Sequence, residues 1–262
     1  MELPPGIAKL YALGRATASD PDGHGTRVCE VVRAQASKAT LLVQSIFDDY
    51  GGLSGIPFDR HELLYPPYAD GARIHCNAWF EGTNDYTQDA FETDAFVAQH
   101  RDLVVVSAGT AARNAIVSDT PATTSANAAA MREYLALEGT KRPSAALVRA
   151  LLAIGDASSI QQATVIRYRD EDTKLDTGDA IAIAMGTPAG RPVEVVLAWT
   201  DLPGYVLQNE LVLEVSVGGT SIEGEGSANV RRATTQGGSI VATVKCRRAL
   251  APQSFALVIC SR

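Results

Sequence analysis

The sequence predicts a chain of class α/β plus all-β, in which a parallel sheet with flanking helices is followed by an antiparallel jelly-roll β-sandwich. In residues 1–159, apolar strand-like runs alternate with helical patterns, as in parallel sheets covered by helices on both faces. In residues 160–262, short strand-like segments follow one another with turn residues between them and no helical pattern. That arrangement is typical of sandwiches and jelly rolls. We therefore place the domain boundary between residues 159 and 160.

The first domain is expected to alternate between strands and helices from its start. The predicted strands are "IAKLYALG", "TLLVQSIFD", "ARIHCNAWF" and "DLVVVSAG". The predicted helices are "RVCEVVRAQA", "DRHELLYPPYADG", "TQDAFETDAFVAQH", "SANAAAMREYLALEG" and "RPSAALVRALLAIGD". Pro66 and Pro67 should weaken the second helix, because proline lacks the amide hydrogen that a helix needs. Gly139 and Gly155 are expected near the ends of the last two helices.

The second domain is expected to consist of strands alone. The predicted strands are "TVIRYRDEDTKL", "DAIAIAMG", "VEVVLAWTD", "ELVLEVSVGG", "ANVRRATTQ", "GSIVATVKC" and "QSFALVIC". The breaks between them are rich in Gly, Pro, Asp and Ser, which favour turns. The loops "SIEGEGSANVRR" and "RDEDTKLD" are acidic but lack the closely spaced aspartates of a calcium cage.

Composition limits the classes of partner. The chain has 262 residues, of which 46% are hydrophobic, and a net charge of −7, so it has no basic field for nucleic acid. Its apolar runs are too short to cross a bilayer. The beginning of the sequence does not resemble a secretory signal, so an intracellular, cytoplasmic location is expected. We expect no nucleic acid or membrane partner.

The cysteine spacing does not predict a metal site. Cys29, Cys76, Cys246 and Cys260 lie far apart in the sequence. We expect buried free thiols, with a Cys246–Cys260 bridge between terminal strands as the open alternative. No metal and no cofactor are predicted.

His24 lies in "SDPDGHGTRVCEVV", a tight turn before an apolar run. "DGHGTRV" resembles the H-G-T-H-V signature around the active-site histidine of subtilisin-like serine proteases. "LLVQSIFDDYGGLSGIP", "DLVVVSAGT" and "GTAARNAIV" look like further segments of that catalytic domain, in the same order. "PVEVVLAWTDLPGYVLQNELVLEV" resembles the C-terminal β-barrel or jelly-roll domain of the alkaline subtilases. The resemblance implies a reduced subtilisin-like sheet, truncated and degenerate.

The same resemblance implies that the catalytic parts are lost. The family's Asp-Ser/Thr-Gly motif has no counterpart, and Asp20 and Asp22 are expected to shape the turn. Thr110 stands at the position of the oxyanion asparagine, and Ser118 is the nearest serine to the nucleophile position, one residue out of step. Phe80 stands where the family's substrate strand ends in glycine and should obstruct the groove. No site residue is therefore expected to function in catalysis, and His24 and Ser118 are interpreted as relics.

The resulting expectation is an inactive subtilisin-like pseudoprotease reused as a structural or interaction module. A protein partner or a second copy would cover the sheet and helix surfaces that the losses expose. The chain would belong to a larger assembly, with a capsid or virus particle as one option. Two alternatives stay open: a residual serine hydrolase using His24 and Ser118, and a β-sandwich that binds glycan or calcium.

Overall fold

The computed structural model describes residues 6–13, 20, 22–48, 50, 52–80, 83, 85–226 and 228–262, without the side chain of Val165. Parts of the predicted segments before His24 lie outside these residues. The chain divides into two compact units, Met1–Phe96 with Val105–Ala130, and Val97–Val104 with Met131–Arg262. The domain boundary between residues 159 and 160 stays a prediction.

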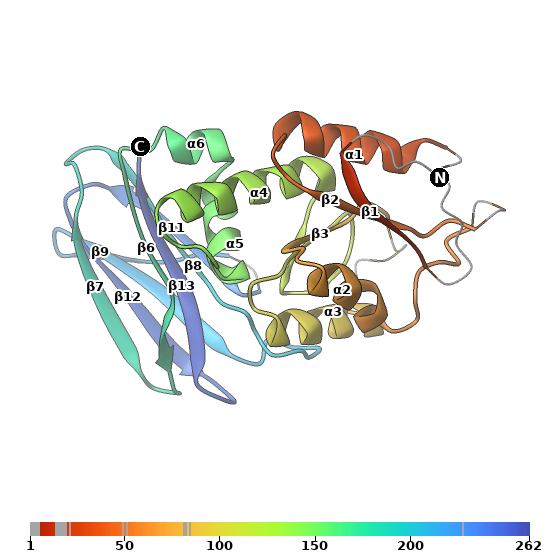
Figure 1. Cartoon of the computed structure of the whole chain (residues 1–262). Coiled ribbons are helices and arrows are strands. Elements are labelled where there is room, and N and C mark those ends of the chain that lie inside the picture. Colours follow the sequence, from red (N-terminus) through yellow and green to blue (C-terminus); the bar gives the residue numbers. More distant parts are fainter. Residues whose placement is uncertain are drawn as a thin grey trace. The chain divides into compact units, whose positions relative to one another are not determined.

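The first unit contains two small sheets (Figure 1). In one of them, β1 (Ile7–Ala12) pairs in parallel with β2 (Leu41–Ser45). The other has the order β3-β4-β5, with β3 at Ile74–Asn77, β4 at Val104–Ser107 and β5 at Ala115–Val117. Strands β4 and β5 are parallel. The helices that begin in this unit are α1 (His24–Gln35), α2 (Arg60–Ala69), α3 (Gln88–Gln99) and α4 (Pro121–Leu137).

Helix α2 continues through both of its prolines, contrary to the predicted weakening. The Asp59 carboxylate begins the helix by accepting the His61 amide at 2.7 Å. Pro67 has no amide hydrogen to offer the carbonyl of Leu63, four residues before it. The Gln44 side-chain amide of β2 donates to that carbonyl at 2.8 Å instead. A side chain from a neighbouring strand thus replaces the hydrogen bond that the proline removes.

The second unit is built around the β-sandwich. Its strands are β6 (Val165–Leu175), β7 (Ala180–Gly186), β8 (Pro192–Ala198), β9 (Glu210–Val217), β10 (Thr220–Glu223), β11 (Val230–Gln236), β12 (Ser239–Arg248) and β13 (Gln253–Ser261). They form two four-stranded sheets, β11-β8-β13-β6 and β10-β9-β12-β7. The first and last strands of the sandwich pair with each other, and successive pairs nest inside them: β6 with β13, β7 with β12, β8 with β11, and β9 with β10. This nested antiparallel pairing, shared between two sheets, is the jelly-roll arrangement.

Alternation along the strands explains the core of the sandwich. In β12, Ile240, Ala242, Val244 and Cys246 are buried while their neighbours are more exposed. Both sheets contribute to one cluster around Trp199 and Phe255, which are fully buried. Since side chains of a strand alternate between its faces, each sheet turns its apolar face toward the other.

Helix α5 (Ala145–Ile154) packs on the sheet that contains β8, β13 and β6. Nearly all of its residues are buried, and Ser144 caps it by accepting the Leu147 amide at 3.0 Å. Strand β13 is therefore covered on both faces and is buried along its whole length. A short helix, α6 (Ala157–Gln161), follows α5. The sequence analysis missed α6, β5 and β10.

The mixed α/β class and the antiparallel sandwich are confirmed. The subtilisin-like parallel core is wrong, because the described strands before β6 form a two-stranded and a three-stranded sheet rather than one sheet covered by helices. Each predicted strand could be recognised by its apolar run, but such runs do not specify which strands pair.

Candidate functional site

His24 is the first residue of α1. It follows Gly23, whose φ of 70° lies in the left-handed region that glycine adopts readily. The imidazole is exposed, and its Nε2 lies 2.8 Å from the carbonyl oxygen of Ala78. A carbonyl oxygen only accepts, so Nε2 carries the proton in this contact. Nε2 of His24 therefore donates a hydrogen bond to the main-chain carbonyl of the residue that follows β3.

Asp20 stabilises the same turn. Its carboxylate accepts the amides of Gly25 at 3.1 Å and Thr26 at 2.7 Å, together with the Thr26 hydroxyl. Burial alone would raise the pKa of Asp20, but these hydrogen bonds outweigh it and lower the pKa. Asp22 accepts the main-chain amide of His24 at 2.9 Å. Both carboxylates therefore cap the N-terminus of α1 by accepting main-chain amides of its first residues.

Ser118 and Thr110 are also engaged locally. The Ser118 hydroxyl oxygen lies 2.7 Å from the Thr124 hydroxyl and accepts the Thr120 amide at 3.1 Å. The Thr110 hydroxyl oxygen accepts the Ala112 amide at 3.2 Å. Within the described residues, no hydrogen bond joins His24 to Ser118 or to Thr110. The structure therefore does not unite these residues in a hydrogen-bonded catalytic group.

The aromatic ring of Phe80 packs over Gly109. A Cβ atom built on Gly109 would lie 2.2 Å from the ring, so a larger residue at this position would have to displace Phe80. Phe80 is nevertheless 54% exposed. The residue thus covers the segment after β4 and leaves part of its ring in solvent.

In the second unit, a buried polar network organises the loop between β8 and β9. Asp201 is fully buried, and its carboxylate accepts the amides of Gln208 at 2.8 Å and Asn209 at 2.9 Å. The buried Asn209 side chain donates to Gln253 at 2.6 Å and accepts the Leu250 amide at 2.8 Å. This network ties residues 201–209 to the turn between β12 and β13, so both loops have a fixed backbone.

The same two loops carry exposed apolar side chains. Tyr205, Leu250 and Val206 are 72%, 66% and 65% exposed, and Leu202 is 38% exposed. We call these four residues the apolar loop patch. Several large apolar side chains exposed on two loops that Asn209 joins are a feature that interaction surfaces share. The sequence contained this signal in "WTDLPGYVLQNE", where apolar residues surround a Pro-Gly turn.

The predicted thiols and metal ligands can also be placed. All four cysteines are free, with Cys246 and Cys260 buried and Cys29 and Cys76 half-buried. Burial raises the pKa of the Cys246 and Cys260 thiols. Among the described residues, no three His, Cys, Asp or Glu side chains are grouped so as to hold a metal ion. The described helices include none long and apolar enough to cross a membrane.

The fold of residues 165–261 defines a jelly-roll β-sandwich. No family model and no curated protein matches the chain. Among solved structures, it is similar to the pre-peptidase C-terminal domain of collagenase from Bacillus anthracis, at 10% identity and a TM-score of 0.27, over 36% of this chain and 87% of that one. A de novo designed double-stranded β-helix matches at 13% identity and a TM-score of 0.21, over 38% and 100% of the two chains. The P-domain of Penaeus vannamei nodavirus matches at 13% identity and a TM-score of 0.21, over 37% of this chain and 96% of that one. Similarity this low carries no argument about function.

The resemblance to subtilisin-like proteases is wrong. The three structural neighbours described above are all-β domains, and none of the three is subtilisin-like. The quoted segments share with subtilases what α/β layers commonly need: apolar runs for buried strands, small residues in packed helices, and glycine before a helix. The assignments of Thr110 to an oxyanion position and Ser118 to a nucleophile position therefore lose their basis.

Proposed function

We propose that this chain is a non-catalytic binding module whose apolar loop patch docks a protein partner. One observation carries the proposal: exposed apolar side chains lie on two loops that buried Asp201 and Asn209 hold in a fixed conformation. Binding to a loop that is already ordered costs less conformational entropy than binding to a mobile one. The patch is therefore organised for recognition.

The composition of the patch favours a protein as the partner. Tyrosine buries a large area, has few rotatable bonds and is frequent among the residues that dominate protein interfaces. Tyr205 and Val206 are adjacent in the sequence and both largely exposed, so a partner can bury apolar surface of both. The apolar loop patch, rather than surfaces exposed by the loss of protease segments, is therefore the proposed contact with the partner.

Native mass spectrometry of the chain isolated from its own cells tests the proposal. The wild-type chain should be recovered in a complex heavier than its own mass of 27.7 kDa, containing a second protein. Tyr205→Ser with Val206→Ser should release the monomer and leave the thermal midpoint unchanged, because both side chains are exposed. Thr220→Ala with Ser221→Ala, on the exposed part of β10, serves as the matched control and should keep the complex.

Two results would contradict the proposal. One is a wild-type chain that is monomeric at its natural concentration, and the other is a complex that survives the patch substitutions. A complex made only of copies of this chain, and lost in the patch variant, would replace the heterologous partner with a second copy.

The non-catalytic part of the proposal has its own test. The hydroxyl of Ser118 is engaged by Thr124, and His24 Nε2 by Ala78. A fluorophosphonate probe should therefore leave the native chain unlabelled, at the same background as Ser118→Ala. Covalent labelling of Ser118 that His24→Ala abolishes would instead favour the serine-hydrolase alternative.

A further inference from the structure

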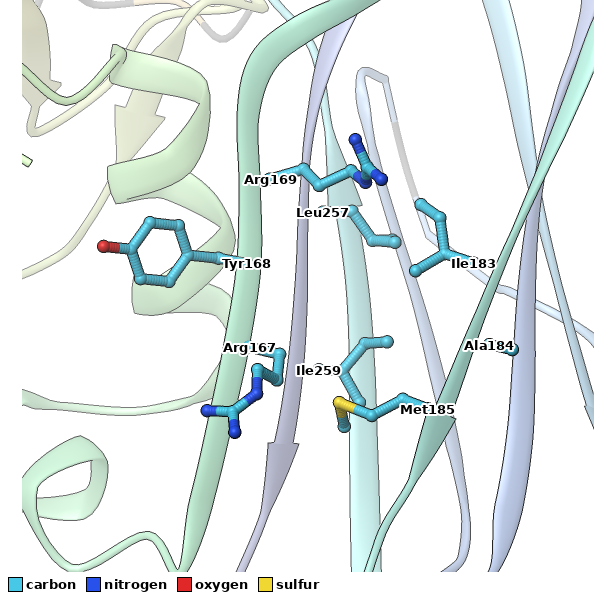
Figure 2. Close-up of a pocket in the computed structure, with 8 residues that line it drawn as sticks. All are labelled: Arg167, Tyr168, Arg169, Ile183, Ala184, Met185, Leu257 and Ile259. Carbon is cyan, nitrogen blue, oxygen red and sulfur yellow. The ribbon is translucent and has the colours of Figure 1, made fainter.

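A slot of about 230 Å³ lies at one open edge of the sandwich (Figure 2). Strand β6 ends one sheet and β7 ends the other. The slot is lined by residues of these two edge strands and of β13, which pairs with β6. It therefore opens between the sheets rather than on the face of either one.

The register of β6 places two arginines on the side of the strand that faces this slot. Arg167 lies opposite Ile259 of β13, and Arg169 lies opposite Leu257. Directly opposed residues of an antiparallel pair share one face of the sheet. Leu257 and Ile259 belong to the buried core, so both arginines stand on the core-facing side of the edge strand. Figure 2 shows Arg169 extending beside Leu257 in the direction of Ile183, whereas Tyr168 points away on the other side of β6. The Arg167 side chain runs in the opposite direction to that of Arg169, down along β6.

The floor of the slot is apolar. Leu257 and Ile259 are each 2% exposed, while Ile183 and Met185 of β7 are partly buried against the same core. In Figure 2 the Met185 side chain reaches toward Ile259. The slot thus places an apolar surface beside the Arg169 guanidinium group, which is partly exposed to solvent.

The charge of the slot is uncompensated within its lining. Among the described residues that line it, two are arginines and none is an aspartate or glutamate. Arg169 pairs with Asp172 at 3.0 Å, but both side chains are substantially exposed, and an exposed pair of this kind is weak. Arg167 donates to the carbonyl of the adjacent Ile166 at 3.2 Å. An incoming anion would therefore displace only a surface ion pair.

We propose that the slot binds a small amphipathic anion, with its apolar part on Leu257, Ile259, Ile183 and Met185 and its carboxylate on the Arg169 guanidinium. The planar guanidinium group presents paired donors that match a carboxylate. This site is separate from the apolar loop patch and does not depend on it. Inward-pointing charges on an edge strand can also serve only to block pairing with other chains, and the test below separates the two roles.

Isothermal titration calorimetry with octanoate tests the proposal on the full chain. Octanoate should bind with a saturable stoichiometry of one, whereas octanol and octylammonium should bind about tenfold more weakly, because they lack the negative charge. Arg169→Gln should weaken octanoate binding by about tenfold, whereas Arg167→Gln should change it less, because the Arg167 side chain runs away from the Arg169 guanidinium. Arg191→Gln, at an exposed arginine between β7 and β8, is the matched control and should bind like the wild type.

A second measurement locates the ligand. Octanoate should shift the methyl resonances of Ile183, Met185 and Leu257 and leave those of Val148 in α5 unchanged. The proposal fails if octanoate does not bind saturably, if octylammonium binds equally well, or if the arginine substitutions change nothing but aggregation. The last result would assign both arginines to protection of the sheet edge.

Discussion

Asp201 and Asn209 lie at the two ends of the loop between β8 and β9, and the Asn209 amide donates to the Asp201 carboxylate at 2.9 Å. Because the same carboxylate accepts the Gln208 amide, the loop closes on a single buried side chain. Trp199, just before the loop, donates a hydrogen bond from its indole N–H to the Asn209 carbonyl oxygen at 3.2 Å. The hydrogen bonds at the two ends of the loop therefore fix its conformation. The apolar side chains in the middle of the loop are exposed to solvent.

Replacing Asp201 should lower the free energy of unfolding of the second unit. Asp201→Ala leaves two main-chain amides without their acceptor, which costs about 2–4 kcal/mol. Asp201→Asn keeps one acceptor oxygen and should cost less. Calorimetric unfolding measures both variants, with Asp172→Ala, at an exposed ion pair, as a control that should change stability by under about 1 kcal/mol. Equal stability of Asp201→Ala and the wild type would contradict this account of the loop.

Arg149 should anchor α5 to the sandwich. Its guanidinium donates to the Trp199 carbonyl at 3.0 Å and to the Thr200 hydroxyl at 3.3 Å, and the residue is 4% exposed. Arg149→Met preserves the aliphatic stem but removes the donors, so we expect a loss of about 2–4 kcal/mol. Hydrogen exchange should then be faster in α5 than in β12. Uniform acceleration, or none, would show that the helix is held by apolar packing alone.

The carboxyl groups of Asp170 and Glu171 should make stability depend on pH. Burial raises the pKa of both, against the opposing effects of hydrogen bonds from Ser144 on Asp170 and of the Arg101 charge on Glu171. The folded chain therefore holds these protons more tightly than the unfolded chain. Their contribution to stability is greatest below the usual carboxyl pKa of about 4 and is lost as pH rises through the raised values.

Asp170→Asn removes one of these titrations while keeping an oxygen that can accept the Ser144 amide. From about pH 4 to pH 7, the variant should lose less stability than the wild type. Denaturant titrations across this range measure the difference, and Glu171→Gln should act in the same direction. A variant whose stability runs parallel to that of the wild type would contradict the assignment.

Gln44 and Pro67 allow a double-mutant cycle in the first unit. Gln44→Ala leaves the Leu63 carbonyl without its side-chain donor and should cost about 1–2 kcal/mol. In the Pro67→Ala background, residue 67 regains an amide that can donate to that carbonyl. Gln44→Ala should therefore cost less there, which unfolding measurements of the four chains can detect. An equal cost in both backgrounds would mean that Gln44 acts through packing.

The sequence predicted most of the strands and helices because their residue patterns are local. The alternation in β12 and the Ser144 cap of α5 are readable without partners. The two sheets of the first unit were not predictable in the same way, since pairing depends on contacts between distant segments. The short strand β10 was missed because Thr220–Glu223 is polar and lies at a sheet edge.

The candidate sites depended still more on distant contacts. His24 attracted attention through its turn, yet its ring contacts Ala78, 54 residues away. The loop patch could be suspected from exposed-looking apolar residues beside Pro203, but Asp201 and Gln253 reveal the rigidity of the loop only in three dimensions. The resemblance to a protease family was wrong because short motifs in α/β sequences report local geometry more than ancestry.

Site-specific photo-crosslinking at Tyr205 tests the central claim most directly. A benzophenone amino acid at position 205, expressed at the natural level in the chain's own cells, should yield one discrete adduct with a partner protein. The same probe at Thr220, on the exposed part of β10, should yield none. Absence of an adduct at position 205, or the same set of adducts at both positions, would contradict the assignment of the apolar loop patch as a docking surface.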